Sequence, residues 1–241
     1  MPSRAQTSAK LIVNSQLIPV QVIYEDNHII IVSKTAGEIV QGDKTGDKPL
    51  SDTVKQYIKE AYAKPGDVFL GVVHRLDRPV AGLVMFARTS KALARLNAMF
   101  SGGQVQKRYW AIVKNAPEQP EGTLVHWLVR NEKQNKSYAY DHEVPRSKRA
   151  ELDYRVIGHS DNYTLVEVNL KTGRHHQIRC QLAQIGCPIK GDLKYGAKRS
   201  NPDGSISLLS RTMHFIHPVS KKEISVEAPL PDDKLWQSFG K

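Results

Sequence analysis

Hydrophobic positions in the first hundred residues change between continuous apolar runs and helical spacing. Residues 29–32 read Ile-Ile-Ile-Val, a run typical of a buried strand, and residues 68–73 and 83–87 show the same pattern. Residues 54–61 instead carry apolar side chains at helical spacing, after a loop rich in Gly, Asp and Lys. The pattern therefore predicts a strand, a long loop, a helix and two further strands.

The pattern over residues 90–186 predicts a helix, three strands and another helix. A helix capped by Ser90 ends at a Gly-Gly pair, and residues 109–113 form the strand that follows. Residues 152–157 and 164–170 alternate as the two strands of a hairpin, and residues 178–185 form a helix closed by glycine. Long antiparallel stretches with segregated helices indicate an α+β fold.

The organisation predicted from this pattern is one domain preceded by a short arm. Residues 1–20 lack periodicity and are expected to form a flexible N-terminal arm, whereas residues 21–241 form the folded domain. We expect a large mixed, mainly antiparallel sheet flanked by helices, which can divide into two lobes. Residues 115–150 are polar and basic, and no element is predicted there.

Charge adds a partner to this picture. The 241 residues contain 35 Lys and Arg against 24 Asp and Glu, a formal net charge of +11, which draws a protein toward polyanions. Residues 171–199 concentrate that excess, with seven cations and a single acid, Asp192. A nucleic acid is therefore the first partner to consider.

Cysteine usage and the apolar runs exclude several classes of protein. Cys180 and Cys187 form neither a CxxC pair nor a second cluster, so a disulfide framework or a four-ligand zinc site is not indicated. No run of about 20 apolar residues and no signal-peptide pattern occurs. We expect a cytoplasmic protein that acts as a monomer, without metal, nucleotide cofactor or membrane.

The segment from His74 to Pro79 is the candidate for chemistry. It places the carboxylate of Asp77 next to Arg78 and two residues from Arg75, and these guanidinium groups favour an ionised carboxylate and can bind phosphate. Such a carboxylate suits a nucleophile or a base acting on a nucleic acid. A loop aspartate that only pairs with its arginines is the alternative, and spacing alone does not decide between them.

The longer segment His-Arg-Leu-Asp-Arg-Pro-Val-Ala-Gly-Leu, residues 74–83, resembles the HRLDRxTSGL signature of the RluA family of RNA pseudouridine synthases. Residues 24–37 are similar to the opening YEDxxLLVxNKPxG segment of that family, and residues 107–111 match its KxYxA strand. Residues 170–196 are similar to its LxTGRxHQIRxxLxxxGxPIxGDxxYG stretch. The resemblance runs from about residue 22 to 231 and implies the pseudouridine synthase fold for the catalytic domain.

The resemblance also implies the reaction and three catalytic roles. The N1–C1′ bond of a uridine in structured RNA, ribosomal or transfer, breaks, the base turns, and C5 joins C1′, with no cofactor. Asp77 is the catalytic residue by this resemblance, acting as a nucleophile at C1′ or as a base at C2′. Arg179 pairs with that aspartate and Tyr109 stacks on the flipped uracil, although a solvent-facing arginine and a core tyrosine are the ordinary alternatives.

Substrate contacts are expected from the two motifs that flank these residues. The arginines suit phosphate binding, and Arg75 or Arg78 can help displace the target base. Adjacent histidines lie about 100° apart on a helix, and no acid at i+4 spacing accompanies them, so we interpret His175 and His176 as contacts or packing and not as metal ligands. The expected substrate-binding residues are His74, Arg75, Arg78, Arg174, His176 and Ile178.

Three departures from the family pattern concern loop packing and RNA contacts. Thr35 stands where the opening motif has Pro, and Val80 and Ala81 replace Thr-Ser, which removes two hydroxyl groups. The accessory S4 domain of the family precedes the catalytic segment, and only about 20 residues do so here. RNA choice is therefore expected from the surface of the catalytic domain.

Two other functions compete with this interpretation. Residues 37–45 nearly fit the phosphate-binding loop GxxxxGK[ST], but Asp43 shifts the lysine by one position and places a negative charge beside the expected phosphates. A nucleotide hydrolase is thus disfavoured. A catalytically inactive RNA-binding protein of the same fold is the other alternative, against which Asp77, Tyr109 and Arg179 occur together.

Overall fold

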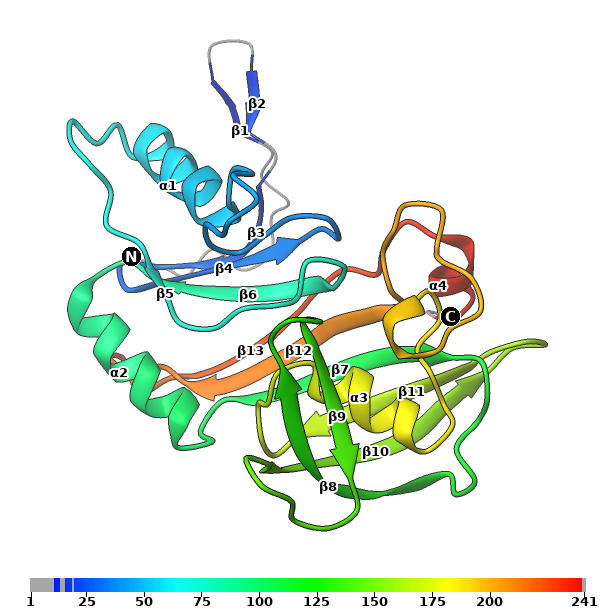
Figure 1. Cartoon of the computed structure of the whole chain (residues 1–241). Coiled ribbons are helices and arrows are strands. Elements are labelled where there is room, and N and C mark those ends of the chain that lie inside the picture. Colours follow the sequence, from blue (N-terminus) through cyan, green and yellow to red (C-terminus); the bar gives the residue numbers. More distant parts are fainter. Residues whose placement is uncertain (1–10, 14–15, 19, 240–241) are drawn as a thin grey trace. The chain divides into compact units, whose positions relative to one another are not determined.

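The computed structural model describes residues 11–13, 16–18 and 20–239, and the chain divides into two compact units (Figure 1). The first unit comprises residues 1–105 and 212–229, and the second comprises residues 106–211 and 230–241. Most of the predicted N-terminal arm lies outside the described residues. Within it, β1 (Leu11–Val13) pairs with β2 (Gln16–Ile18).

The first unit is built on short antiparallel strands with two helices. Its strands are β3 (Gln21–Glu25), β4 (Ile29–Lys34), β5 (Gly71–Val72), β6 (Ala81–Ala87) and β13 (Glu223–Glu227). β4 lies between β3 and β6 in the sheet, and its successive side chains are buried on both faces, which explains why its apolar run has no alternation. The helices are α1 (Leu50–Ala61) and α2 (Ser90–Ser101).

The second unit contains a five-stranded antiparallel ladder. The strands follow the order β7 (Gln106–Val113), β11 (Thr164–Leu170), β10 (Lys148–His159), β8 (Glu121–Asn131) and β9 (Lys136–Tyr140). It also contains α3 (Gln177–Gln184), the 3₁₀ turn η1 (Leu193–Tyr195) and α4 (Lys234–Ser238). β12 (Leu208–Ile216) carries the boundary between the units.

The structure confirms the α+β class and the hairpin formed by β10 and β11, and it corrects the sequence prediction elsewhere. Of the strand predicted over residues 68–73, only Gly71–Val72 forms one. Residues 115–150 contain the strands β8 and β9, whose half-exposed faces give no continuous apolar run. The second helix is capped by Thr89, whose side chain accepts from the Ala92 amide, and not by Ser90. No helix of the described residues is long and apolar enough to cross a membrane.

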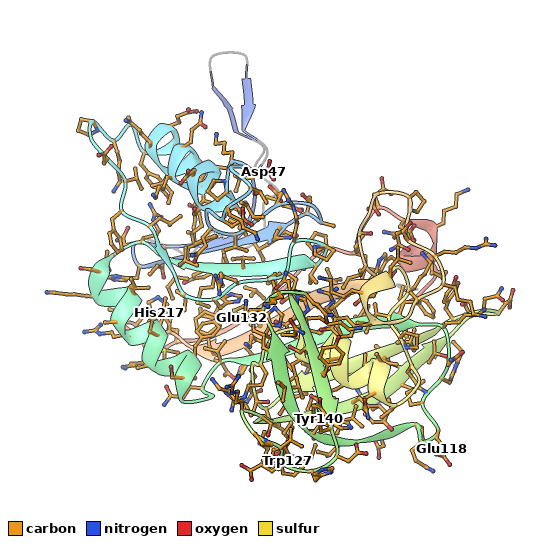
Figure 2. The ribbon with its side chains drawn as sticks, in the orientation of Figure 1. Asp47, Glu118, Trp127, Glu132, Tyr140 and His217 are labelled. Atoms are coloured by element: carbon orange, nitrogen blue, oxygen red, sulfur yellow. The ribbon has the colours of Figure 1, made fainter. Side chains whose placement is uncertain are left out.

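One carboxylate organises the turn between β3 and β4. Asp26 accepts from the backbone amides of His28 and Ile29 at 2.7 and 2.8 Å and from the Tyr24 hydroxyl at 2.8 Å. His217, labelled in Figure 2, places its Nε2 2.9 Å from the same carboxylate and is 1 % exposed. Burial opposes the charge, but these hydrogen bonds outweigh it and lower the pKa of Asp26.

His217 is held as a neutral ring. Its Nδ1 accepts from the amides of Val219 and Ser220 at 3.2 and 2.9 Å, so the proton lies on Nε2, facing Asp26. Burial lowers the pKa of His217, and the neighbouring carboxylate only partly offsets this effect. His217 therefore has a structural role beside the turn between β3 and β4.

We expect Asp26→Asn to lower the free energy of unfolding by about 2 kcal/mol at pH 7, because three hydrogen-bond donors and the adjacent His217 ring lose a charged neighbour. The folded pKa of Asp26 is below its unfolded value near 4, so its contribution is present above about pH 4 and disappears as pH falls through the folded pKa. Urea unfolding at pH 7 and pH 3 should show the difference between wild type and variant shrinking with acid. Asp52→Asn, on the exposed surface of α1, is the control and should change stability by less than about 0.5 kcal/mol.

Candidate active site

Asp77 lies in the loop between β5 and β6, as the sequence predicts. Leu76 and Val80 on either side are buried, whereas Asp77 itself is half-buried and its neighbour Arg78 is exposed. The Val80 amide donates to the Asp77 carbonyl at 3.0 Å and closes a tight turn. Two apolar side chains thus fix the loop, and one carboxylate remains partly accessible on it.

A buried lysine that the sequence analysis did not single out holds this loop. Lys34 is 1 % exposed at the end of β4, and its ammonium donates to the carbonyls of Thr35, Arg78 and Val80 at 2.9, 3.1 and 2.6 Å. Burial lowers the pKa of Lys34 to about 8, and the negative charges of Glu38 and Asp77 oppose that shift. The signals in the sequence are a lysine at the end of a mainly apolar strand and the fixed lysine of the opening motif, which falls on Lys34.

Arg78 fastens the loop from the other side. Its Nε donates to the Gly37 carbonyl at 2.9 Å, and its own carbonyl accepts from the Gly37 amide at 2.8 Å. Its guanidinium also forms an ion pair with Asp47, labelled in Figure 2, in the loop before α1. An exposed pair of this kind is weak, so phosphate can replace Asp47 as the partner. The phosphate-binding role of Arg78 stays a prediction.

The remaining predicted contacts of the first unit differ in exposure. His74 accepts from the Met85 amide through Nε2 at 3.0 Å, and its ring stacks on Phe100 with centroids 4.8 Å apart. This hydrogen bond from the Met85 amide sets the His74 tautomer, with the ring proton on Nδ1 when the ring is neutral. Arg75 is exposed and suits contact with phosphate.

In the second unit, Tyr109 lies on β7 opposite Val168 of β11 and is 6 % exposed. Arg179 lies on α3 and is 5 % exposed. Its Nε and one terminal nitrogen donate to the two carboxylate oxygens of Asp192 at 2.7 and 2.9 Å, and its guanidinium lies 5.1 Å from the Tyr195 ring centroid. Arg179 is therefore not a solvent-facing helix arginine.

Asp192 is the buried partner of Arg179, and the sequence analysis left it without a role. It is 1 % exposed and holds Arg179 through a bidentate, charge-assisted contact. Its signal in the sequence is its position as the single acid among seven cations in residues 171–199. A buried guanidinium there requires a buried carboxylate nearby.

The histidine pair does not lie on a helix, which corrects the sequence interpretation. α3 begins after His176, whose φ of 52° is left-handed, and the rings of His175 and His176 stack with centroids 3.8 Å apart. His176 Nδ1 lies 3.0 Å from the Tyr195 hydroxyl, which also accepts from the Ser137 amide at 2.8 Å. Within residues 20–239, the His, Cys, Asp and Glu side chains form no group of three that could hold a metal ion.

The predicted site residues thus form two groups. Asp77, His74, Arg75 and Arg78 belong to the first unit, and the other five belong to the second. In the second unit, Arg174 Nε donates to the Arg149 carbonyl at 3.0 Å, and Ile178 is buried. The pairing of Asp77 with Arg179 and the stacking of uracil on Tyr109 stay predictions.

Comparison with known proteins extends over both groups. A family model described as RNA pseudouridylate synthase matches residues 28–184. A ribosomal large subunit pseudouridine synthase D of Zymomonas mobilis is 32% identical over 228 residues, which cover 90% of this chain and 71% of the relative. An uncharacterized RNA pseudouridine synthase of Chlorobaculum parvum is 33% identical over 238 residues, covering 90% and 72%. The solved structure of human RNA pseudouridylate synthase domain containing 4 is similar in fold, with a TM-score of 0.74 at 21% identity over 90% of each chain.

We expect Lys34→Met to loosen the Asp77 loop, because three backbone carbonyls lose their shared buried donor. The free energy of unfolding should fall by about 2 kcal/mol, and the amides of residues 76–78 and 80 should exchange hydrogen faster. Urea unfolding and hydrogen exchange measure the two effects. The exposed Lys55→Met on α1 serves as the control; unchanged exchange in Lys34→Met would contradict the anchoring role.

Asp192→Ala should destabilise the second unit by about 3–5 kcal/mol, since it leaves the Arg179 guanidinium buried without its carboxylate. Thermal and urea unfolding measure this loss. Combining it with Arg179→Met should recover part of the stability, because the uncompensated charge is then absent. Equal losses in the single and the double variant would show that the ion pair does not carry the effect.

Proposed function

Because this chain belongs to the RNA pseudouridylate synthase family, we propose that it isomerises selected uridines of structured RNA through the carboxylate of Asp77. The family makes the protein an isomerase that converts uridine in RNA to pseudouridine. The observation that carries the choice of Asp77 is its loop: the buried Lys34 ammonium and two buried apolar side chains hold the backbone around one partly accessible carboxylate.

The isomerisation conserves every atom of the nucleotide. The N1–C1′ bond breaks, the C5–C1′ bond forms, and the C5 hydrogen leaves as a proton while N1 gains one. The reaction therefore consumes no oxidant and no second substrate. Asp77 acts at the sugar, either by attacking C1′ or by removing the C2′ proton, and both routes use the ionised carboxylate.

Arg179 and Tyr109 complete the proposed site. A guanidinium that Asp192 already orients can present its remaining N–H donors to the catalytic carboxylate without a further loss of side-chain entropy. Tyr109 offers an aromatic face for the extruded uracil. Extrusion costs a few kcal/mol, which contacts from Arg75, Arg78 and Arg174 to phosphate can offset.

The names of the relatives favour ribosomal RNA over transfer RNA as the substrate. Several of them, from Zymomonas, Xanthomonas and Pseudomonas, are ribosomal large subunit pseudouridine synthases that are 32% identical to this chain. Its net charge of +11 suits a large folded RNA. We extend the proposal to the large-subunit RNA, to action as a monomer and to the cytoplasm.

The proposal predicts that RNA carrying tritium at uridine C5 releases tritium to water with wild-type protein and not with Asp77→Ala. Joining C5 to C1′ must displace that hydrogen, so the release counts turnovers. Asp77→Asn, which keeps the shape and loses the charge, should reduce the rate at least about 10³-fold. The exposed Asp67→Asn of the same unit is the control and should keep wild-type activity.

Large-subunit RNA that lacks pseudouridine is the appropriate substrate, with transfer RNA as the comparison. Tritium release from transfer RNA alone would overturn the choice of RNA, and full activity of Asp77→Asn would overturn the choice of residue. RNA binding without any release would favour the inactive RNA-binding alternative.

A further inference from the structure

One face of the sheet in the second unit carries aromatic and basic side chains that the proposed reaction does not use. Strand register places Trp127 of β8 opposite Tyr140 of β9 and opposite Arg149 of β10. Tyr138 and Lys136 precede Tyr140 by two and four residues, and alternation puts all of these side chains on one side of the strands. We call this set, Trp127, Lys136, Tyr138, Tyr140 and Arg149, the aromatic face.

The opposite face of the same strands is closed by α3. Leu128, Ala139 and Ala150 alternate with the residues of the aromatic face and pack in one cluster with Cys180 and Ala183 of the helix. The aromatic face therefore points away from α3, and Figure 2 labels Trp127 and Tyr140 on it. Tyr138 and Tyr140 are 38% and 40% exposed. Packing against α3 therefore does not explain why aromatic residues occupy these two positions.

The cations of this face lie close to its rings. The Lys136 ammonium is 5.3 Å from the ring centroids of both Tyr138 and Tyr195, and the Arg149 side chain is 52% exposed. The acids that follow on β10 are already paired: Glu151 with Arg149 at 2.6 Å and Asp153 with Lys171 at 2.8 Å. A ligand that approaches this face therefore meets exposed tyrosine rings beside Lys136, next to acids whose charges are offset by Arg149 and Lys171.

We propose that the aromatic face binds a single-stranded segment of RNA, with bases stacked on Tyr138, Tyr140 and Trp127 and phosphates beside Lys136 and Arg149. The inference rests on the proposed function, because it gives an RNA isomerase a second contact with its substrate outside the catalytic residues. Exposed aromatic side chains on a sheet, flanked by cations, are the arrangement that stacks two or three unpaired bases in other RNA-binding sheets.

Single exposed aromatic residues are ordinary on protein surfaces, so the argument for a binding surface depends on their grouping. Here, two neighbouring register positions of one hairpin supply three rings, with Lys136 at the next position of β9 and Arg149 opposite Trp127 on β10. A protein partner would favour a contiguous apolar patch, whereas charges border these rings. Charge complementarity with a phosphate backbone therefore favours RNA as the occupant.

The test uses a fluorescently labelled twelve-residue oligoadenylate, which contains no uridine and cannot serve as the isomerisation substrate. Fluorescence anisotropy should show saturable binding to wild-type protein. Tyr138→Ala/Tyr140→Ala should weaken it at least about tenfold, since a stacked base contributes about 1–3 kcal/mol. Tyr138→Phe/Tyr140→Phe should bind as wild type, because stacking needs only the ring. Phe69→Ala, which removes another exposed ring from the first unit, is the matched control.

A crosslinking experiment on the wild-type protein is independent of whether the variants fold. Ultraviolet irradiation of the complex followed by peptide mapping should place oligoadenylate adducts on residues 136–140. Adducts confined to other segments, equal binding by the double alanine variant, or no binding at all would each overturn the inference.

Two measurements separate this inference from the proposed function. Asp77→Ala should bind the oligoadenylate as wild type does, although it should release no tritium from uridine-labelled RNA. If the wild-type protein isomerises uridine but binds the oligoadenylate independently of the tyrosines, only the proposed RNA binding by the aromatic face is overturned. If binding depends on the tyrosines but no uridine is isomerised, the proposed function is overturned and the proposed RNA binding by the aromatic face is retained.

Discussion

The buried ammonium of Lys34 is the interaction on which the candidate site depends. A cation that is 1 % exposed must satisfy its donors within the protein, and three carbonyls at 2.6–3.1 Å do so. Two of those carbonyls belong to Arg78 and Val80, which follow Asp77 in the loop. The position of the carboxylate is thus tied to the end of β4, a strand covered on both faces. The charge also acts directly, because Asp77 is among the acids that oppose the lowered pKa of Lys34.

The second unit also buries a cation, and there an ion pair stabilises it. Arg179 and Asp192 are both almost fully buried, and their bidentate contact fixes the guanidinium plane against Tyr195. Tyr195 continues the network to His176 and to the backbone of β9. Buried ion pairs contribute little to stability in general, whereas they define one orientation of the groups involved. An arginine proposed to contact a catalytic carboxylate needs that orientation more than it needs stability.

In the sheet of the second unit, successive side chains alternate between two faces that have different roles. One face supplies the small apolar residues on which α3 packs, and that packing positions Arg179. The other face leaves tyrosines and cations in solvent, where they serve no packing role against the helix. A one-residue change of register in β9 would exchange the two sets. The helix that carries the proposed catalytic arginine and the proposed RNA contact are therefore consequences of a single register.

The sequence by itself determined the α+β class, the loop that carries Asp77 and the family, because continuous apolar runs and a long ordered series of motifs are local signals. It missed β8 and β9, whose half-exposed strands mix polar and apolar residues, and it placed His175 and His176 on a helix that begins one residue later. Only the tertiary structure assigned roles to Lys34 and Asp192. Each is a charged residue in an apolar environment, and its purpose depends on partners 44 and 13 residues away, Arg78 and Arg179, which no local pattern encodes.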